Sequence, residues 1–164
     1  MIGCPGSGKT TFTRAVADRL HLPAVHLDGY YHQKEHDYYN DQPAWLRQVK
    51  DLAAGSRWIM DGNYASILSL RLQRADTVIF FDFPKHMSLY GVVKRAVQHR
   101  NKHRAEMPSD WQETINWEFI KFVWNFRRDM RGQTVQALEE ANAPLRLVTL
   151  KNRKQVKAYL ATLS

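Results

Sequence analysis

Short apolar runs alternate with longer amphipathic segments along this chain of 164 residues. The apolar runs cover residues 24–28, 57–61, 76–82 and 145–150, and each has the length of a strand. The residues from Val78 to Phe81 are all apolar, which is typical of a strand that is buried on both faces. The alternation therefore predicts an α/β fold, with helices on both sides of a parallel sheet, in one domain over residues 1–164.

The segments between these runs repeat apolar residues at the spacing of a helix. One repeat follows the glycine-rich start of the chain, and a second passes through Trp45, with Asp41 as its predicted cap and Gly55 as its predicted end. The polar residues 101–110 lie between two long helices, and we expect a mobile loop there. The other predicted helices lie near 67–74, from Pro84 to about 101, from 109 or 110 onward, and around 156–163.

The first predicted helix follows a glycine-rich segment, residues 3–10, that reads Gly-Cys-Pro-Gly-Ser-Gly-Lys-Thr. This segment fits G-x-x-x-x-G-K-[ST], a loop whose backbone N–H groups cradle phosphate oxygens at a helix N-terminus. Lys9 would bridge the β- and γ-phosphates, and the Thr10 hydroxyl would hold magnesium. The predicted ligands are ATP and Mg²⁺, and the predicted nucleotide-binding residues are Pro5, Gly6, Ser7, Gly8, Lys9, Thr10 and Thr11.

The segment before this loop is unusually short. A phosphate-binding loop normally follows a complete buried strand, whereas here Met1 and Ile2 are all that stands before Gly3. The start could lie upstream, residues could be omitted from the sequence, or the central strand could be truncated. Because the sheet would not hold together without its central strand, we expect that residues before the loop are missing from the sequence.

Two aspartates end predicted strands that point the same way, and ligands bind beyond the carboxyl ends of such strands. Asp61 is the better candidate for the acidic partner of the magnesium ion, and it also counts among the predicted substrate-binding residues. Asp28 is the better candidate for binding the acceptor or removing its proton. The alternative for each is a structural cap at the strand end. Asp82 ends the next strand before Phe83 and Pro84, and there we expect a helix cap.

The charge is strongly positive, with 24 Lys and Arg against 16 Asp and Glu, a net +8 that favours anionic partners. Residues 94–104 hold five basic residues and no acidic one. Arg95, Arg100 and Arg104 would therefore lie on a lid that closes over the transferring phosphoryl group and neutralises its charge. The alternative is a solvated helix face. Arg71 could hold a phosphate of the acceptor.

The remaining composition narrows the class of protein. A single cysteine, Cys4, allows no internal disulfide and suits a cytoplasmic location. We expect no membrane contact, because no apolar stretch is long enough to cross a bilayer and no secretory leader is present. The seven histidines show no metal-ligand spacing, so we expect no zinc site. The aromatic residues of 111–126 favour core packing, with adenine stacking as the alternative.

Several segments resemble the DNA topology modulation proteins, which are adenylate-kinase-like P-loop proteins. These segments are the loop GCPGSGKTT, HLD at 26–28, WIMDGNY at 58–64, RLQRADTVIFFDFP at 71–84 and the basic helix with Arg95 and Arg100. The resemblance implies a three-layer P-loop NTPase fold like that of nucleoside monophosphate kinases. It implies five parallel strands in the order 2-3-1-4-5, an acceptor-binding region near residues 29–55 and a lid near residues 95–110.

The chain also departs from adenylate kinases. Those proteins have Asp-Gly-Phe-Pro-Arg where this chain has Asp61-Gly62-Asn63-Tyr64-Ala65, so the arginine that would grip AMP is missing. On the acceptor side we expect Asp28, Tyr30, Asp61, Tyr64 and Arg71.

Together these residues predict a kinase that moves the γ-phosphoryl group of ATP to a nucleotide, a nucleoside or another small hydroxyl acceptor. The segment His-Leu-Asp followed by two tyrosines favours a hydroxyl or nucleoside acceptor, because a hydroxyl benefits from a nearby carboxylate. The alternative is an ATP-dependent DNA-binding regulator that uses the positive surface. The chain shows no nucleic-acid-reading motif, so nucleic acid ranks second as a partner. The guanine-reading pattern of GTPases is absent as well.

Overall fold

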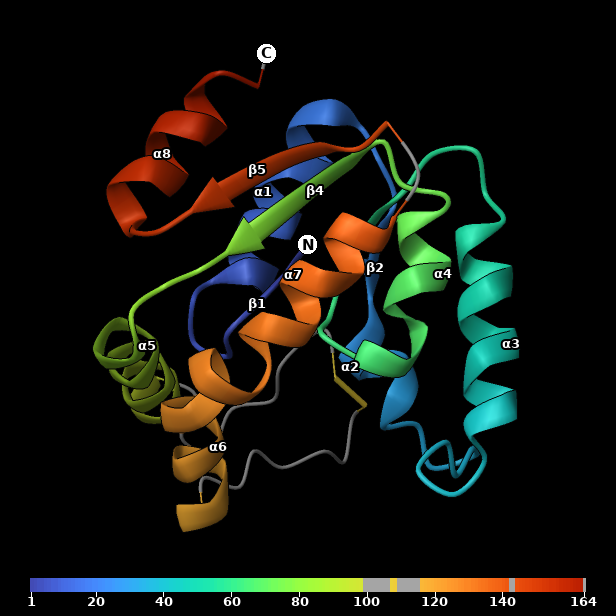
Figure 1. Cartoon of the computed structure of the whole chain (residues 1–164), viewed down its shortest axis with the longest axis horizontal. Helices are drawn as coiled ribbons and strands as arrows, with labels where there is room; N and C mark the ends of the chain where they lie inside the picture. The colour runs from blue at the N-terminus through green and yellow to red at the C-terminus, as the bar shows by residue number, and fades with distance from the viewer. Residues whose placement is uncertain (99–106, 109–115, 142–143, 164) are drawn as a thin grey trace.

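The computed structural model describes residues 1–98, 107–108, 116–141 and 144–163 (Figure 1). Five strands are assigned among these residues: β1 (Ile2–Gly3), β2 (Ala24–His26), β3 (Ile59–Asp61), β4 (Thr77–Phe81) and β5 (Arg146–Leu150). The helices between them are α1 (Lys9–Leu20), α2 (Leu27–Tyr31), α3 (Gln42–Ala53), the short 3-10 helix η1 (Ala65–Ile67), α4 (Leu68–Leu72), α5 (Lys85–Gln98), α6 (Trp117–Asp129), α7 (Arg131–Glu140) and α8 (Arg153–Ala161).

The strands pair in parallel, as expected, but in two groups. One group has the order β1-β4-β5 and the other pairs β2 with β3. The sequence predicted one five-stranded sheet, whereas the largest sheet among the described residues has three strands. The division falls beside β1, because that strand is only two residues long. Backbone hydrogen bonds nevertheless cross the division: Met1 N donates to Met60 O at 2.6 Å, and Gly62 N donates to Met1 O at 3.3 Å.

Helices cover both faces of the β1-β4-β5 sheet. Ile79 and Phe81 of β4 pack against α1 and α8, in a core that includes Phe12 and Val16. Val78 and Phe80 alternate with them and pack against α4 and α7 on the opposite face. The unbroken apolar run is therefore buried on both sides, and a layer of helices on each face of a sheet is confirmed (Figure 1).

A second core lies under α3, beside the β2-β3 pair. Trp45, Val49 and Ala53 are buried on one face of the helix and pack against β2 and β3. The Asp41 side chain accepts a hydrogen bond from Ala44 N at 2.9 Å, which confirms the predicted cap. The helix ends at Ala53, two residues before the predicted stop at Gly55.

Three elements differ from the sequence prediction. Residues 24–28 were expected to be one strand, but β2 ends at His26, and Asp28 lies in the first turn of α2. α7 was not expected, because none of its side chains is fully buried and its sequence shows little apolar periodicity. The helix predicted from 109 or 110 is described only from Trp117, where the Asn116 side chain accepts from Phe119 N at 2.8 Å.

Candidate active site

The glycine-rich loop joins β1 to α1 and curls back over the start of the helix. Gly6 and Gly8 have φ of 78° and 92°, conformations that L side chains rarely adopt. Ser7 Oγ donates to Cys4 O at 2.7 Å inside the loop. Gly8 precedes the helix and no side chain caps it, so the first-turn N–H groups of α1 remain available to a ligand. Thr10 is half-buried and Thr11 is exposed in that first turn.

Lys9 folds back into the loop. Its Nζ donates to Gly3 O at 2.6 Å and to Cys4 O at 3.0 Å. Burial lowers the pKa of the Lys9 ammonium, while the negative charges of Asp28 and Asp61 act in the opposite direction and the Arg95 charge lowers it further. Two of the predicted acidic residues and one predicted lid arginine therefore lie within electrostatic reach of this ammonium.

Asp61 ends β3 and is almost fully buried, with 5% of its surface exposed. His26 is its neighbour in the parallel register of β2 and β3, and His26 Nδ1 lies 2.8 Å from Asp61 Oδ1. Burial would raise the pKa of the Asp61 carboxyl, but the His26 hydrogen bond and the charges of His26 and Lys9 outweigh it and lower this pKa. Asp61 is therefore an ionised carboxylate at neutral pH, and we take His26 Nδ1 as the donor.

Asp28 of α2 and Tyr64, which follows β3, are in contact. Tyr64 OH donates to Asp28 Oδ1 at 3.0 Å. Burial first, and then the charge of Asp28, raise the pKa of the Tyr64 hydroxyl, so it remains a donor. The Tyr64 ring lies 4.7 Å from the Tyr31 ring and 5.1 Å from the Trp45 ring, measured between ring centroids. Tyr30 is half-buried against the same core. Asp28 itself is exposed, at the edge of an aromatic wall.

Arg71 lies in α4, beneath the turn that follows β3. It is 5% exposed, and its NH1 donates to Gly62 O at 2.9 Å. Its Nε and NH2 have no hydrogen-bond partner among the described residues. Burial lowers the pKa of this guanidinium to about 10, whereas Asp61 raises it. Arg71 thus supports the Gly62 backbone from within the protein and does not project into solvent.

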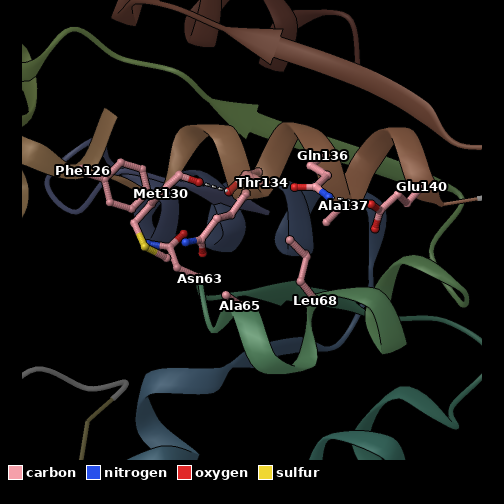
Figure 2. Close-up of a pocket in the computed structure, with 10 residues that line it drawn as sticks. Asn63, Ala65, Leu68, Phe126, Met130, Thr134, Gln136, Ala137 and Glu140 are labelled. Carbon is pink, nitrogen blue, oxygen red and sulfur yellow. Dashed lines mark hydrogen bonds between the residues drawn. The ribbon is translucent and has the colours of Figure 1, made fainter. Parts of the chain in front are cut away.

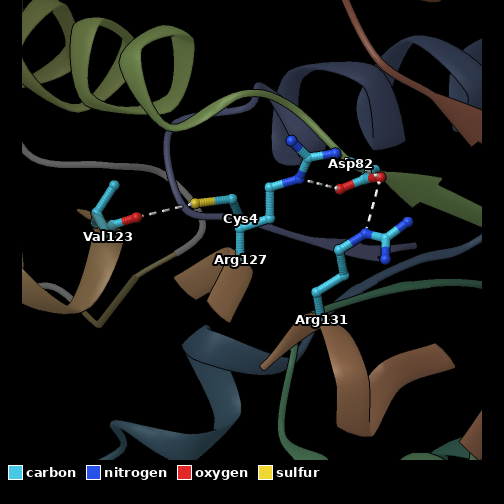
Figure 3. Close-up of polar contacts among 5 residues, drawn as sticks. All are labelled: Cys4, Asp82, Val123, Arg127 and Arg131. Atoms are coloured by element: carbon cyan, nitrogen blue, oxygen red, sulfur yellow. Dashed lines mark hydrogen bonds and ion pairs between the residues drawn. The ribbon is translucent and has the colours of Figure 1, made fainter. Parts of the chain in front are cut away.

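Asp82 does not cap α5, which corrects the sequence prediction. Met87 N and Ser88 N both donate to Pro84 O at the start of that helix, and the buried Asp82 carboxylate faces α6 and α7 instead (Figure 3). Arg127 Nε lies 3.2 Å from Asp82 Oδ1, and Arg131 Nε lies 3.0 Å from Asp82 Oδ2. A single buried carboxylate therefore holds two arginines that are about half exposed.

These two arginines lie beside the glycine-rich loop. Cys4 of the loop packs with Val123 and Phe126 of α6, and its Sγ lies 3.8 Å from Val123 O. Burial raises the pKa of the Cys4 thiol, which suits a packing role better than a reactive one. Arg127 directly follows Phe126 in α6 and is four residues beyond Val123, which Figure 3 shows beside Cys4. The sequence prediction did not include Arg127, Arg131 or His26 among the site residues. For the two arginines the sequence did hold an indication, namely an aspartate at the end of a buried strand and a helix rich in basic residues that could pair with it.

The predicted lid is described only in part. Arg95 lies in the last turn of α5, near the Lys9 charge. Arg100 and Arg104, and most of the segment 95–110, lie outside the described residues. Within the part of the chain that is described, no helix combines the length and apolarity of a membrane span.

The fold has a counterpart among solved structures. The chain is similar to the crystal structure of a putative kinase from Chloroflexus aurantiacus, with a TM-score of 0.53 and 16% sequence identity, over 98% of this chain and 93% of that one. The likeness shows a kinase-like α/β fold. No protein-family model matches the sequence, and no curated protein matches it. The resemblance to DNA topology modulation proteins therefore remains an expectation from the sequence.

Proposed function

We propose that this chain is a kinase that moves the γ-phosphoryl group of ATP to a small acceptor that bears a hydroxyl group. The observation that carries the proposal is the position of the Lys9 ammonium, which lies inside a glycine-rich loop at a helix N-terminus, with two carboxylates and an arginine within electrostatic reach. This combination provides a phosphate cradle, an acidic metal partner, a candidate base and a cation at one edge of a parallel sheet.

We also propose that the two groups of strands act as one sheet in the order 2-3-1-4-5. The two hydrogen bonds of Met1, from its amino group to Met60 O of β3 and from Gly62 N just after β3 to Met1 O, support this order, because they follow the alternating donor and acceptor pattern of a parallel pair. In that arrangement the phosphate-binding loop occupies the centre of the sheet. Residues 29–55 would then form the acceptor side, and residues 95–110 the lid.

The donor set suits ATP with Mg²⁺. The Thr10 hydroxyl and the Asp61 carboxylate offer the oxygen ligands that Mg²⁺ prefers, and the low pKa of Asp61 keeps that carboxylate ionised. The hydrogen bond to His26 uses Oδ1 and leaves Oδ2 for the metal or its water. Bound there, Mg²⁺ would neutralise charge on the phosphates. Lys9 and the loop residues Pro5 to Thr11 would hold the phosphates themselves.

Asp28 is the proposed base for the hydroxyl acceptor. The acceptor oxygen forms a bond to the γ-phosphorus, the bond from that phosphorus to the β–γ bridging oxygen breaks, ADP leaves, and the hydroxyl proton passes to Asp28. The hydrogen bond from Tyr64 orients this carboxylate. Arg95 is proposed to stabilise the transferring charge, together with Arg100 and Arg104, and we assign the same task to Arg127 and Arg131, which Asp82 holds beside the loop.

The test is transfer of labelled γ-phosphate from ATP across a panel of nucleosides, nucleoside monophosphates and small hydroxyl metabolites. We expect transfer to one class, a loss of at least about a hundredfold with Lys9→Ala, and a comparable loss with Asp28→Asn if the acceptor is a hydroxyl. Lys157→Ala is the control, because this lysine lies exposed on α8. ATP binding without transfer to any compound would contradict the kinase and favour the DNA-binding alternative, which predicts affinity for DNA that falls steeply with salt.

A further inference from the structure

A pocket of about 220 Å³ lies between the turn after β3 and the helices α6 and α7 (Figure 2). One wall is built by Asn63, Ala65 and Leu68, and the other by residues of α6 and α7, among them Phe126 and Gln133. None of the residues of the phosphate-binding loop lines it. None of the site residues predicted from the sequence lines it either.

One residue links this pocket to the phosphate-binding loop. Gly3 N donates to Asn63 Oδ1 at 2.9 Å, and Gly3 O accepts from Lys9 Nζ at 2.6 Å. The amide of a pocket residue and the loop ammonium are therefore attached to the two polar groups of the same glycine. At the α6 end, Phe126 lines the pocket and also packs in the cluster that contains Cys4 of the loop. The pocket thus adjoins the loop on both of its walls.

The pocket carries no positive charge. In a chain with a net charge of +8, none of the lining residues is Lys, Arg or His, and Glu140 alone among them is ionisable. A phosphate group would find no cation there, so the pocket fits an uncharged group. Two cations directly follow lining residues along the chain, Arg127 after Phe126 and Arg131 after Met130, and both are held on Asp82.

The lining combines amide groups with apolar side chains. The Asn63 amide uses its oxygen on Gly3 N, which leaves Nδ2 as a donor, while the exposed Gln133 amide offers both a donor and an acceptor. Phe126 and Leu68 supply flat or apolar contact. Such a lining matches a heterocycle whose edge carries both donors and acceptors. The volume is below the roughly 300–1,000 Å³ of pockets that enclose a drug-sized ligand, so it fits one end of a molecule.

We propose that this pocket binds the uncharged heterocyclic end of the phosphoryl acceptor, which makes the acceptor nucleoside-like and not a simple polyol. The inference rests on the proposed kinase function. Asn63 lines the pocket while its neighbour Tyr64 donates to Asp28, so the turn that carries both residues lies between the pocket and the candidate base. An acceptor that lies across this turn would place its heterocycle in the pocket and its hydroxyl toward Asp28.

The first test fills the pocket without disturbing a buried side chain. Ala65 is exposed and lines the pocket, whereas the adjacent Ser66 is exposed and does not. With the best nucleoside acceptor, we expect Ala65→Phe to raise the acceptor KM about tenfold or more and to leave the ATP KM within about twofold, because a lost pocket contact is worth about 1–2 kcal/mol of acceptor binding. Ser66→Phe is the matched control and should change neither constant.

The second test removes hydrogen bonding without changing size. Gln133→Leu should raise the acceptor KM about three- to tenfold, since one lost hydrogen bond is worth about 0.5–1.5 kcal/mol. Glu139→Leu, at an exposed position of α7 that does not line the pocket, is the control. For an acceptor that lacks a heterocycle, neither pocket variant should change the KM.

A binding measurement separates the two proposals. Calorimetric titration of the wild-type chain with adenosine, guanosine, cytidine and uridine should show binding of at least one, weakened by Ala65→Phe and not by Ser66→Phe. Transfer that persists with an unchanged acceptor KM in both pocket variants would overturn the pocket assignment and leave the kinase standing. Nucleoside binding that requires the pocket, with no transfer to any acceptor, would support the pocket and overturn the kinase. No binding of any nucleoside would overturn the pocket assignment.

Discussion

Gly91 of α5 and Gly6 of the glycine-rich loop are in direct backbone contact. A Cβ on Gly91 would lie 2.0 Å from Gly6 O, and a Cβ on Gly6 would lie 2.3 Å from Ser88 O. No side chain separates the helix from the loop at this point. The position of α5, which carries Arg95, is therefore coupled to the shape of the loop.

Gly91→Ala should separate the helix from the loop and weaken both folding and nucleotide binding. We expect a loss of about 1–3 kcal/mol in the free energy of unfolding, typical of overpacking against backbone, and a reduced affinity for ATP. Gly132→Ala is the control, because a Cβ there meets nothing within 4 Å and alanine favours a helix. Denaturant unfolding and ATP titration would check this. Equal stability of the two variants would show that α5 can shift without cost.

Asp82→Asn should destabilise the contact between β4 and the α6–α7 pair. The carboxylate is buried while the two arginines are about half exposed, so solvent screening reduces the expected loss to about 1–2 kcal/mol of unfolding free energy. A double-mutant cycle of Asp82→Asn with Arg131→Met should give a coupling energy above the error of the measurement. The exposed pair of Arg128 and Asp129 is the control and should show no measurable coupling. Additive effects at Asp82 and Arg131 would contradict the contact.

His26→Ala should change the Mg²⁺ requirement of the proposed kinase. The imidazole is hydrogen-bonded to one oxygen of Asp61. Replacing a residue that is hydrogen-bonded to a metal ligand commonly changes metal affinity by about ten- to a hundredfold. We expect a higher Mg²⁺ concentration for half-maximal rate, with His26→Asn in between, because its amide can still donate. His86→Ala is the control, because this histidine is exposed on α5 and lies outside the proposed acceptor side. An unchanged Mg²⁺ requirement in both His26 variants would separate this contact from metal binding.

The Asp61 carboxylate should make stability depend on acid. Its folded-state pKa lies below the ordinary value of 3.8, so the folded state binds this proton less readily than the unfolded chain does. The stabilisation is thus present above about pH 4 and disappears as the pH falls below 3.8 toward the folded-state pKa. Unfolding free energies measured between pH 5 and 2.5 should fall less steeply for Asp61→Asn than for the wild type. Parallel curves would contradict the lowered pKa.

Local patterns in the sequence were sufficient for most of the elements but not for their contacts. The helix around Trp45 and its cap at Asp41 could be predicted because both depend on residues within one or two helical turns. α7 could not, because it buries no side chain fully and its apolar residues show no clear period. The end of β2 was placed two residues too late, since His26-Leu27-Asp28 continues the polar and apolar alternation of a strand into the first turn of α2.

The missed site contacts have a common physical origin. His26 meets Asp61 because β2 and β3 pair in one particular parallel register, and Asp82 meets Arg127 because α6 packs beside the loop. Both contacts join residues 35 or more positions apart, and no local pattern encodes such a register or packing. The glycine-rich loop before α1 could be predicted because its pattern lies within eight consecutive residues, and its phosphate-binding role stays a prediction.

The internal contacts of Lys9 have a consequence for selectivity. The Lys9 ammonium already donates two of its three hydrogen bonds, to the carbonyls of Gly3 and Cys4. An incoming anion has to replace these carbonyls, which belong to the same chain and lose no translational entropy when they bind the ammonium. A chloride ion or a lone carboxylate gains little from that exchange. A polyphosphate gains more, since it engages the ammonium, several loop amides and the helix end at once. The resting loop should thus discriminate by the number of oxygens that a ligand presents together, and ignore the far more abundant monovalent anions around it.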